Sequence, residues 1–128
     1  MKKLVITLFS AALLALALLT ACSKPTESGE VAPSSVIHVV TVSWNAEATP
    51  EEIQAALDAV VTLADEYDGI SRVWIRSIKA QGERTHAFVM EFKSEQALVD
   101  YADSDAQKKW YESYIDVRDA STTFDITN

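Results

Sequence analysis

The residues best suited to proton chemistry in this sequence are its two histidines, His38 and His86. Each begins a row of mostly apolar residues at alternate positions. The first row runs from His38 to Trp44, and the second runs from His86 to Phe92. An imidazole in such a row can transfer a proton, bind a ligand or complete a hydrogen bond in the core. The sequence leaves these three interpretations open. A metal site is disfavoured because it needs a third ligand, and no carboxylate stands at an obvious ligand spacing.

Motifs of several other reaction classes are absent from the sequence. We find no Gly-rich phosphate loop, no nucleophile elbow and no His–carboxylate–Ser spacing. Cys22 is the only cysteine, which excludes an internal disulfide, a CxxC redox site and a cysteine zinc cluster. Arg72 and Arg76 flank Trp74, and such charges on an edge strand usually prevent pairing with other chains. We therefore expect neither a cofactor nor a metal.

Four strands and three helices are expected to position the histidines. Val36–Trp44 is a β-branched strand, and Thr49, Pro50 and Glu52 supply the capping box and the first-turn proline of an amphipathic helix. The remaining elements are a strand over 70–80, a strand over 85–92, short helices after Ser94 and Ser104, and a last strand over 121–126. Ser104 and Gln107 form a second candidate capping box. The order β-α-β-β-α-β predicts an α+β, ferredoxin-like domain over residues 36–128.

The two central strands of that fold, 36–44 and 85–92, are expected to be parallel neighbours, which would bring His38 and His86 together on the helix side. Both strands are apolar on both faces, although two helices can cover only one face of a sheet. We therefore expect a second copy of the chain to cover the other face. This predicts a homodimer with the sheets face to face.

The first 21 residues have the features of an export signal. Lys2 and Lys3 precede an apolar run, and "LTAC" at residues 19–22 resembles the lipobox of bacterial lipoproteins. We expect cleavage before Cys22, acylation of its thiol, and stable anchoring by two or three acyl chains. Ser23 follows the cysteine, which favours the outer membrane, facing the periplasm, in an organism with two membranes. The predicted location is the cell envelope.

Residues 22–35 are predicted to be the lipidated cysteine and a flexible tether, because "SKPTESGEVAPSS" has no apolar periodicity. Loss of residues 1–21 removes two lysines and no acid, which leaves 9 basic and 19 acidic side chains and a net charge of −10. Such a surface repels nucleic acid and anionic headgroups. Membrane attachment is therefore expected to depend on the lipid alone, and no nucleic-acid partner is expected.

Residues 36–128 resemble the stress-responsive A/B barrel, or Dabb, family. The resemblance is carried by "IHVVTVSW", by "PEEIQAAL" and by "THAFVMEFKSEQALVDYADSDAQKKW", in this order and spacing. It implies a dimeric α+β barrel with a pocket between sheet and helices. By position, His38, His86 and Tyr101 match pocket residues of a plant polyketide cyclase of the family. Gln107 stands where the cyclase has a further histidine, and an amide cannot shuttle a proton at neutral pH.

Three functional hypotheses follow. The first is a membrane-anchored lipoprotein that binds a small, largely apolar molecule in a pocket lined by His38, Trp44, His86, Tyr101 and Gln107. The second is a cyclase or cofactor-free oxygenase for an aromatic or polyketide-like substrate, in which His86 acts as the base and Tyr101 holds the substrate. The third is a structural or stress-related interaction protein of the envelope. A cavity of a few hundred Å³ would favour the first two.

Overall fold

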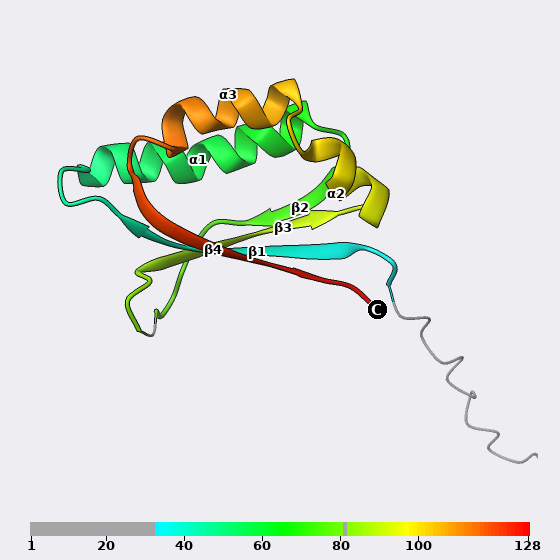
Figure 1. Ribbon diagram of the computed structural model, residues 1–128, viewed down its shortest axis with the longest axis horizontal. Coiled ribbons are helices and arrows are strands. Elements are labelled where there is room, and N and C mark those ends of the chain that lie inside the picture. The colour runs from blue at the N-terminus through cyan, green and yellow to red at the C-terminus, as the bar shows by residue number, and fades with distance from the viewer. Residues whose placement is uncertain (1–32, 81) are drawn as a thin grey trace, which may run out of the picture. The chain divides into compact units, whose positions relative to one another are not determined.

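A computed structural model describes residues 33–80 and 82–128 (Figure 1). The predicted signal peptide, Cys22 and most of the predicted tether lie outside these residues. Within the described part of the chain, no helix has the length and apolar character needed to cross a membrane. The elements are β1 (Val36–Trp44), α1 (Pro50–Glu66), β2 (Ile70–Trp74), β3 (His86–Phe92), α2 (Glu95–Tyr101), α3 (Asp105–Tyr114) and β4 (Arg118–Ile126).

The strands form one sheet in the order β2-β3-β1-β4, and every pairing is antiparallel. This confirms the ferredoxin-like α+β fold. The expectation of parallel central strands is wrong, because β1 and β3 run in opposite directions, with His38 opposite Met90 and His86 opposite Val42. The crossover through α1 makes β1 and β2 parallel. β3 lies between them and follows β2 along the chain, so it runs antiparallel to both β2 and β1.

The helices begin at side-chain caps. The Thr49 hydroxyl accepts a hydrogen bond from the Glu52 backbone N–H at 3.2 Å, and the Glu52 carboxylate accepts from the Thr49 N–H at 2.9 Å, as the capping box predicts. The second box forms only in part. Ser104 accepts from the Gln107 N–H at 3.2 Å, but the Gln107 side chain accepts from the Asp103 N–H at 2.8 Å. Asp103 has a φ of 62°, so this bond fixes an uncommon backbone conformation before α3.

The edge strand β2 is shorter than the sequence predicts. It ends at Trp74, although β-branched and apolar residues continue beyond it. The reason is that the Ser77 hydroxyl contacts Ala87 directly: it accepts from the Ala87 N–H at 2.8 Å and donates to the Ala87 carbonyl at 2.9 Å. A side chain thus takes the place of the backbone ladder. In contrast, β4 begins at Arg118, three residues earlier than expected.

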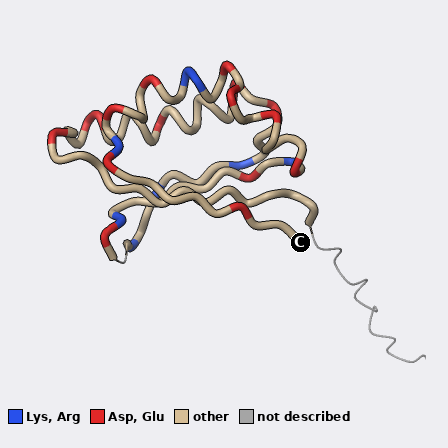
Figure 2. Tube along the Cα trace, in the orientation of Figure 1, with Lys and Arg blue, Asp and Glu red and all other residues tan. Residues whose placement is uncertain are grey.

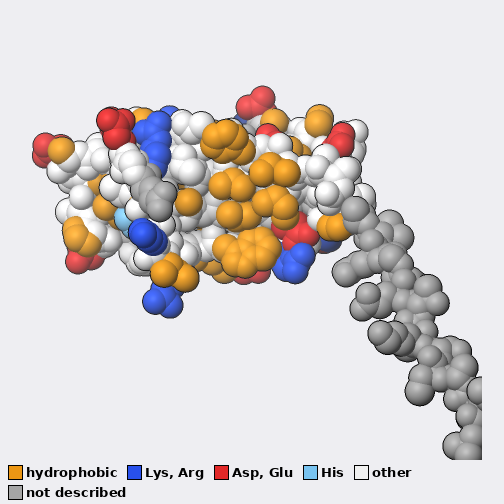
Figure 3. All heavy atoms as spheres, turned by 90° about the horizontal axis from the view of Figure 1, so that it is seen from below, with side chains coloured by type: hydrophobic (Ala, Val, Ile, Leu, Met, Phe, Trp, Pro, Cys, Tyr) orange, Lys and Arg blue, Asp and Glu red, His pale blue; other side chains and the backbone are white. Residues whose placement is uncertain are grey.

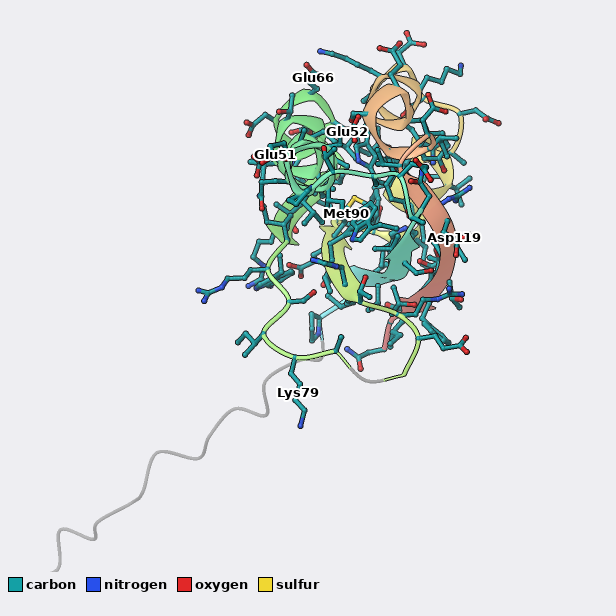
Figure 4. All side chains as sticks on the ribbon, turned by 90° about the vertical axis from the view of Figure 1, so that its left-hand side faces the viewer. Glu51, Glu52, Glu66, Lys79, Met90 and Asp119 are labelled. Carbon is teal, nitrogen blue, oxygen red and sulfur yellow. The ribbon has the colours of Figure 1, made fainter. Side chains whose placement is uncertain are left out.

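The hydrophobic core fills the space between the helices and the inner face of the sheet. Met90 lies in this layer (Figure 4), together with Phe88 and Phe92 of β3 and with Val60 and Leu63 of α1. Each large apolar side chain buried here contributes roughly 1.5–3 kcal/mol to folding. The core therefore provides a firm support for residues on the inner face of β1 and β4.

The other face of the sheet is not covered by any described element (Figure 1). The strand register aligns apolar residues across this face, and Figure 3 shows them gathered in one patch. Trp74, Phe124 and Ile126 are 47%, 56% and 57% exposed. We call this patch the open face; its residues are Ile37, Val39, Trp74, Val89, Phe124 and Ile126.

Candidate ligand-binding cavity

A cavity of about 330 Å³ lies between the sheet edge formed by β1 and β4 and the helices α2 and α3. Its two sides differ in chemistry. The strand side carries His38, Arg118, Ser121, Thr123 and Asp125, and the helix side carries Tyr101, Gln107, Trp110, Tyr111 and Tyr114. The volume is within the range of small-molecule sites. The cavity thus combines a polar wall with an aromatic wall.

One end of the cavity holds a histidine–carboxylate pair that sequence reasoning missed. The His38 Nδ1 lies 2.5 Å from Oδ1 of Asp125, which stands directly opposite it on β4. The imidazole also packs edge-on against Phe92 and Tyr101, with ring centroids 5.7 and 6.4 Å apart. A carboxylate on one ring nitrogen holds the proton there and leaves Nε2 free to accept another. The pair can therefore act as a hydrogen-bond acceptor or as a base.

Tyr101 lies beside this pair and is 3% exposed. Its hydroxyl has no hydrogen-bond partner among the described residues. Burial raises the pKa of Tyr101 far above its usual value, and the neighbouring Gln107 side chain acts in the opposite direction. Tyr101 therefore stays a neutral hydroxyl that can donate to a ligand. Gln107 has its carbonyl oxygen committed to the Asp103 N–H, which gives it a structural role at the start of α3.

The other end of the cavity is built from Trp110, Tyr114 and Arg118. Trp110 and Tyr114 are 5% and 2% exposed, and their rings stack with centroids 4.5 Å apart. The Arg118 guanidinium lies over the Tyr114 ring at 5.5 Å. Burial raises the pKa of the Tyr114 hydroxyl, whereas contacts with Ser121 and Arg118 lower it.

Four buried polar atoms lack a hydrogen-bond partner among the described residues: Tyr101 Oη, Trp110 Nε1, Tyr114 Oη and Arg118 Nε. All four belong to residues that line this cavity. A buried polar group without a partner costs about 1–3 kcal/mol, and folded proteins rarely leave such groups unsatisfied. Their concentration around one cavity sets it apart from the rest of the described chain, where no other buried side-chain N or O atom lacks a partner.

The other two residues predicted for the pocket, His86 and Trp44, do not line this cavity. His86 lies opposite Val42, which is four residues along β1 from His38, or roughly 14 Å at about 3.4 Å per residue. The prediction that the two histidines adjoin is therefore wrong, because β1 and β3 are antiparallel. Instead, the Trp44 indole N–H donates to Nδ1 of His86 at 2.9 Å. These contacts match the interpretation of His86 as a hydrogen-bonded structural residue.

A second cavity of about 310 Å³ lies between α1 and α3, where Lys109 forms an ion pair with Glu66. Trp110 lies between the two cavities and lines both. In the described part of the chain, no group of three or more His, Cys, Asp or Glu residues could hold a metal ion.

The fold is shared by solved structures of low sequence identity. A dimeric protein with a ferredoxin-like fold from Bacteroides fragilis is 14% identical, with a TM-score of 0.62 over 77% of this chain and 100% of the other. A hydroxynitrile lyase from Passiflora edulis is 13% identical, with a TM-score of 0.63 over 75% and 94%. A cofactor-independent oxygenase from Streptomyces nogalater is 10% identical, with a TM-score of 0.55 over 73% and 90%.

No curated protein gives a significant match to this chain. The model of the stress-responsive A/B barrel domain matches residues 36–128, which is the whole of the folded domain and the region where the sequence resemblance lies. The chain is therefore a member of the stress-responsive A/B barrel (Dabb) family.

Proposed function

We propose that the Dabb domain binds a small organic molecule in the cavity between β4 and α3. The observation that carries this proposal is the set of four unpartnered polar atoms on Tyr101, Trp110, Tyr114 and Arg118. A ligand with oxygen acceptors would supply partners for the atoms at its end of the cavity, while its apolar body packs against the aromatic wall. The sequence suggested a largely apolar ligand. The polar strand side of the cavity supports a ligand that is polar along one edge.

A cavity-filling variant tests this proposal. Thr123 lines the cavity, so the larger side chain of Thr123→Trp should fill part of it. This variant should not bind the small aromatic acids and amides that the wild type binds. Tryptophan fluorescence or NMR measures the binding. Val99 is exposed on α2 and does not line the cavity, so Val99→Trp adds the same bulk as a control. Equal binding by both variants would place any ligand elsewhere and contradict the proposal.

A second candidate function is proton-transfer catalysis without a cofactor, and the His38–Asp125 pair supports it. In this scheme Asp125 orients the ring, and Nε2 of His38 accepts a proton from an acidic C–H bond of an aromatic or polyketide-like substrate. Tyr101 donates to the oxygen on which negative charge develops. His38 thus takes the role of base that the sequence suggested for His86.

Deuterium exchange distinguishes catalysis from binding alone. Carbon acids such as aryl ketones, incubated with the domain in deuterated buffer, should incorporate deuterium faster than in buffer, and His38→Gln should abolish the excess. His86→Gln is the matched control and should exchange at the wild-type rate. Wild-type exchange no faster than buffer would leave the binding function and reject the catalytic one.

We also propose that two copies associate through the open face. Its apolar residues resemble the core of an interface, the strands contain few charged residues compared with the helices and loops (Figure 2), and a similar fold is described as dimeric. Light scattering of residues 33–128 should give a dimer at micromolar concentration. Phe124→Lys should yield monomers, whereas Val61→Lys, an equivalent change on α1, should not. A monomeric wild-type domain would contradict this arrangement.

The proposed location is the cell envelope, with acylated Cys22 as the anchor and the acidic domain held on a tether. The "LTAC" motif supports this proposal. Cys22→Ser should leave uncleaved, unacylated precursor, as measured by intact mass. Normal processing and membrane retention of the variant would contradict the anchor. In an organism with two membranes, we propose the periplasmic side of the outer membrane, which fractionation tests.

A further inference from the structure

Arg118 stands in an unusual position for a cation. It begins β4, lines the cavity and lies over the Tyr114 ring. The other cations near acidic groups, such as Arg72 and Lys109, form ion pairs with Glu91 and Glu66. Arg118 forms none with the described residues. Its charge is therefore not neutralised by a carboxylate of the described residues.

The hydrogen bonds of Arg118 show which edge of the guanidinium is free. Nη1 donates to the Ser121 hydroxyl at 3.1 Å. Nε is buried and has no partner, and Nη2 makes no hydrogen bond to the described residues. The N–H groups of Nε and Nη2 project from the same edge of the planar group, in the fork that binds a carboxylate with two parallel hydrogen bonds.

Two other residues that line the cavity also carry unpartnered donors. Trp110 Nε1 can only donate, and the Tyr114 hydroxyl can donate to an oxygen acceptor. The one carboxylate that lines the cavity, Asp125, is paired with His38 at the far end. On β1, the partners of Asp125 and Arg118 are His38 and Trp44, which are six residues apart, or roughly 20 Å along the backbone at about 3.4 Å per residue. The contact with His38 also engages the Asp125 carboxylate, which limits its repulsion of an anion at Arg118.

We propose that the ligand is a small organic carboxylate on a flat apolar body, with its acid group on the Nε–Nη2 edge of Arg118 and its body against Trp110 and Tyr114. This inference rests on the proposed ligand-binding function, because it names the class of molecule that the same cavity takes. The stacked aromatic side chains select a planar body. The free guanidinium edge selects a carboxylate over its neutral amide.

A matched pair of probes tests the inference: 2-naphthoate and its neutral isostere 2-naphthamide, titrated by calorimetry into the wild-type domain. Naphthoate should bind at least about ten-fold more tightly, which corresponds to about 1.4 kcal/mol. It should also shift the NMR signal of the Trp110 indole N–H. Arg118→Gln should abolish the preference for the acid. Arg118→Lys, which keeps the charge and loses the fork, should retain only part of it.

Arg76→Gln provides the control, because Arg76 is exposed and outside the cavity, and the change in net charge is the same. It should leave the preference intact. Equal or tighter binding of the amide by the wild type would overturn the carboxylate inference and leave the binding function standing. A preference that survives Arg118→Gln would overturn the assignment to Arg118. If the wild type binds neither probe by calorimetry, and neither probe shifts the NMR signal of the Trp110 indole N–H, both the carboxylate inference and the proposed binding function would be overturned.

Discussion

Replacement of Glu91 by glutamine should reduce stability at neutral pH and remove a defined part of the acid sensitivity of the domain. Glu91 is a buried carboxylate, 5% exposed, on the side of β3 that faces away from the helices. Its Oε2 accepts a hydrogen bond from Nε of Arg72. Hydrogen bonds from Arg72 and then Ser35 lower the pKa of Glu91 from 4.5 to about 2, and burial opposes them.

The size of the effect follows from that shift. Without screening, a fall in pKa from 4.5 to about 2 corresponds to roughly 3 kcal/mol. The Arg72 side chain is 66% exposed, and solvent screening reduces the value to about 1–2 kcal/mol. Because the folded-state pKa is the lower one, this stabilisation is present above pH 4.5 and is lost as the pH falls toward 2.

Urea denaturation at pH 7 and at pH 2.5 measures both quantities. Glu91→Gln should cost about 1–2 kcal/mol at pH 7 and much less at pH 2.5, where the wild type has lost most of the same stabilisation. Asp68→Asn is the control, because its ion pair with Lys93 is exposed and should contribute less than about 0.5 kcal/mol. A cost for Glu91→Gln no larger than that for Asp68→Asn, or an acid sensitivity of the variant equal to that of the wild type, would refute this role of Glu91.

Three further changes test the structural roles assigned to particular residues. Trp44→Phe removes the indole N–H that donates to His86 and should lower the free energy of unfolding by about 1 kcal/mol in urea denaturation. Ligand binding should not change, and loss of binding would return His86 to the site. Gly69→Ala would put a Cβ 2.3 Å from the Tyr67 ring; moving that ring should cost about 1–3 kcal/mol, so an unchanged melting temperature would be contrary to the packing described. Thr49→Ala removes the cap of α1 and should cost about 1 kcal/mol by thermal unfolding; no loss would show that the capping bonds do not matter.

Local patterns in the sequence predicted most of the fold because they depend on near neighbours. The caps at Thr49 and Ser104 lie within a few residues of the groups they bind, and the apolar stripe of α1 reflects the helical repeat alone. The direction of β3 relative to β1 depends on the crossover through α1 and on the position of β3 between two strands. Periodicity is the same for parallel and antiparallel central strands, so the pattern could not give their direction.

Only part of the candidate site could be predicted, because sequence patterns do not show which residues meet across the sheet. His38, Tyr101 and Gln107 line the cavity, whereas His86 and Trp44 lie near the opposite end of β1. Asp125 was missed because it is separated from His38 by 87 positions in the sequence and adjoins it only through the β1–β4 register. A useful signal was present in β4, where Ser121, Thr123 and Asp125 alternate as polar residues on the face turned toward the helices.

Native mass spectrometry of the protein purified from its own cells tests the central claim, ligand binding in the Dabb cavity, most directly. We expect the wild-type protein to carry an additional small mass that is released on unfolding. The Thr123→Trp variant should lack this mass, and the Val99→Trp variant should retain it. A wild-type protein that shows only the mass of its covalent chain, or a bound mass that persists in Thr123→Trp, would contradict ligand binding in this cavity.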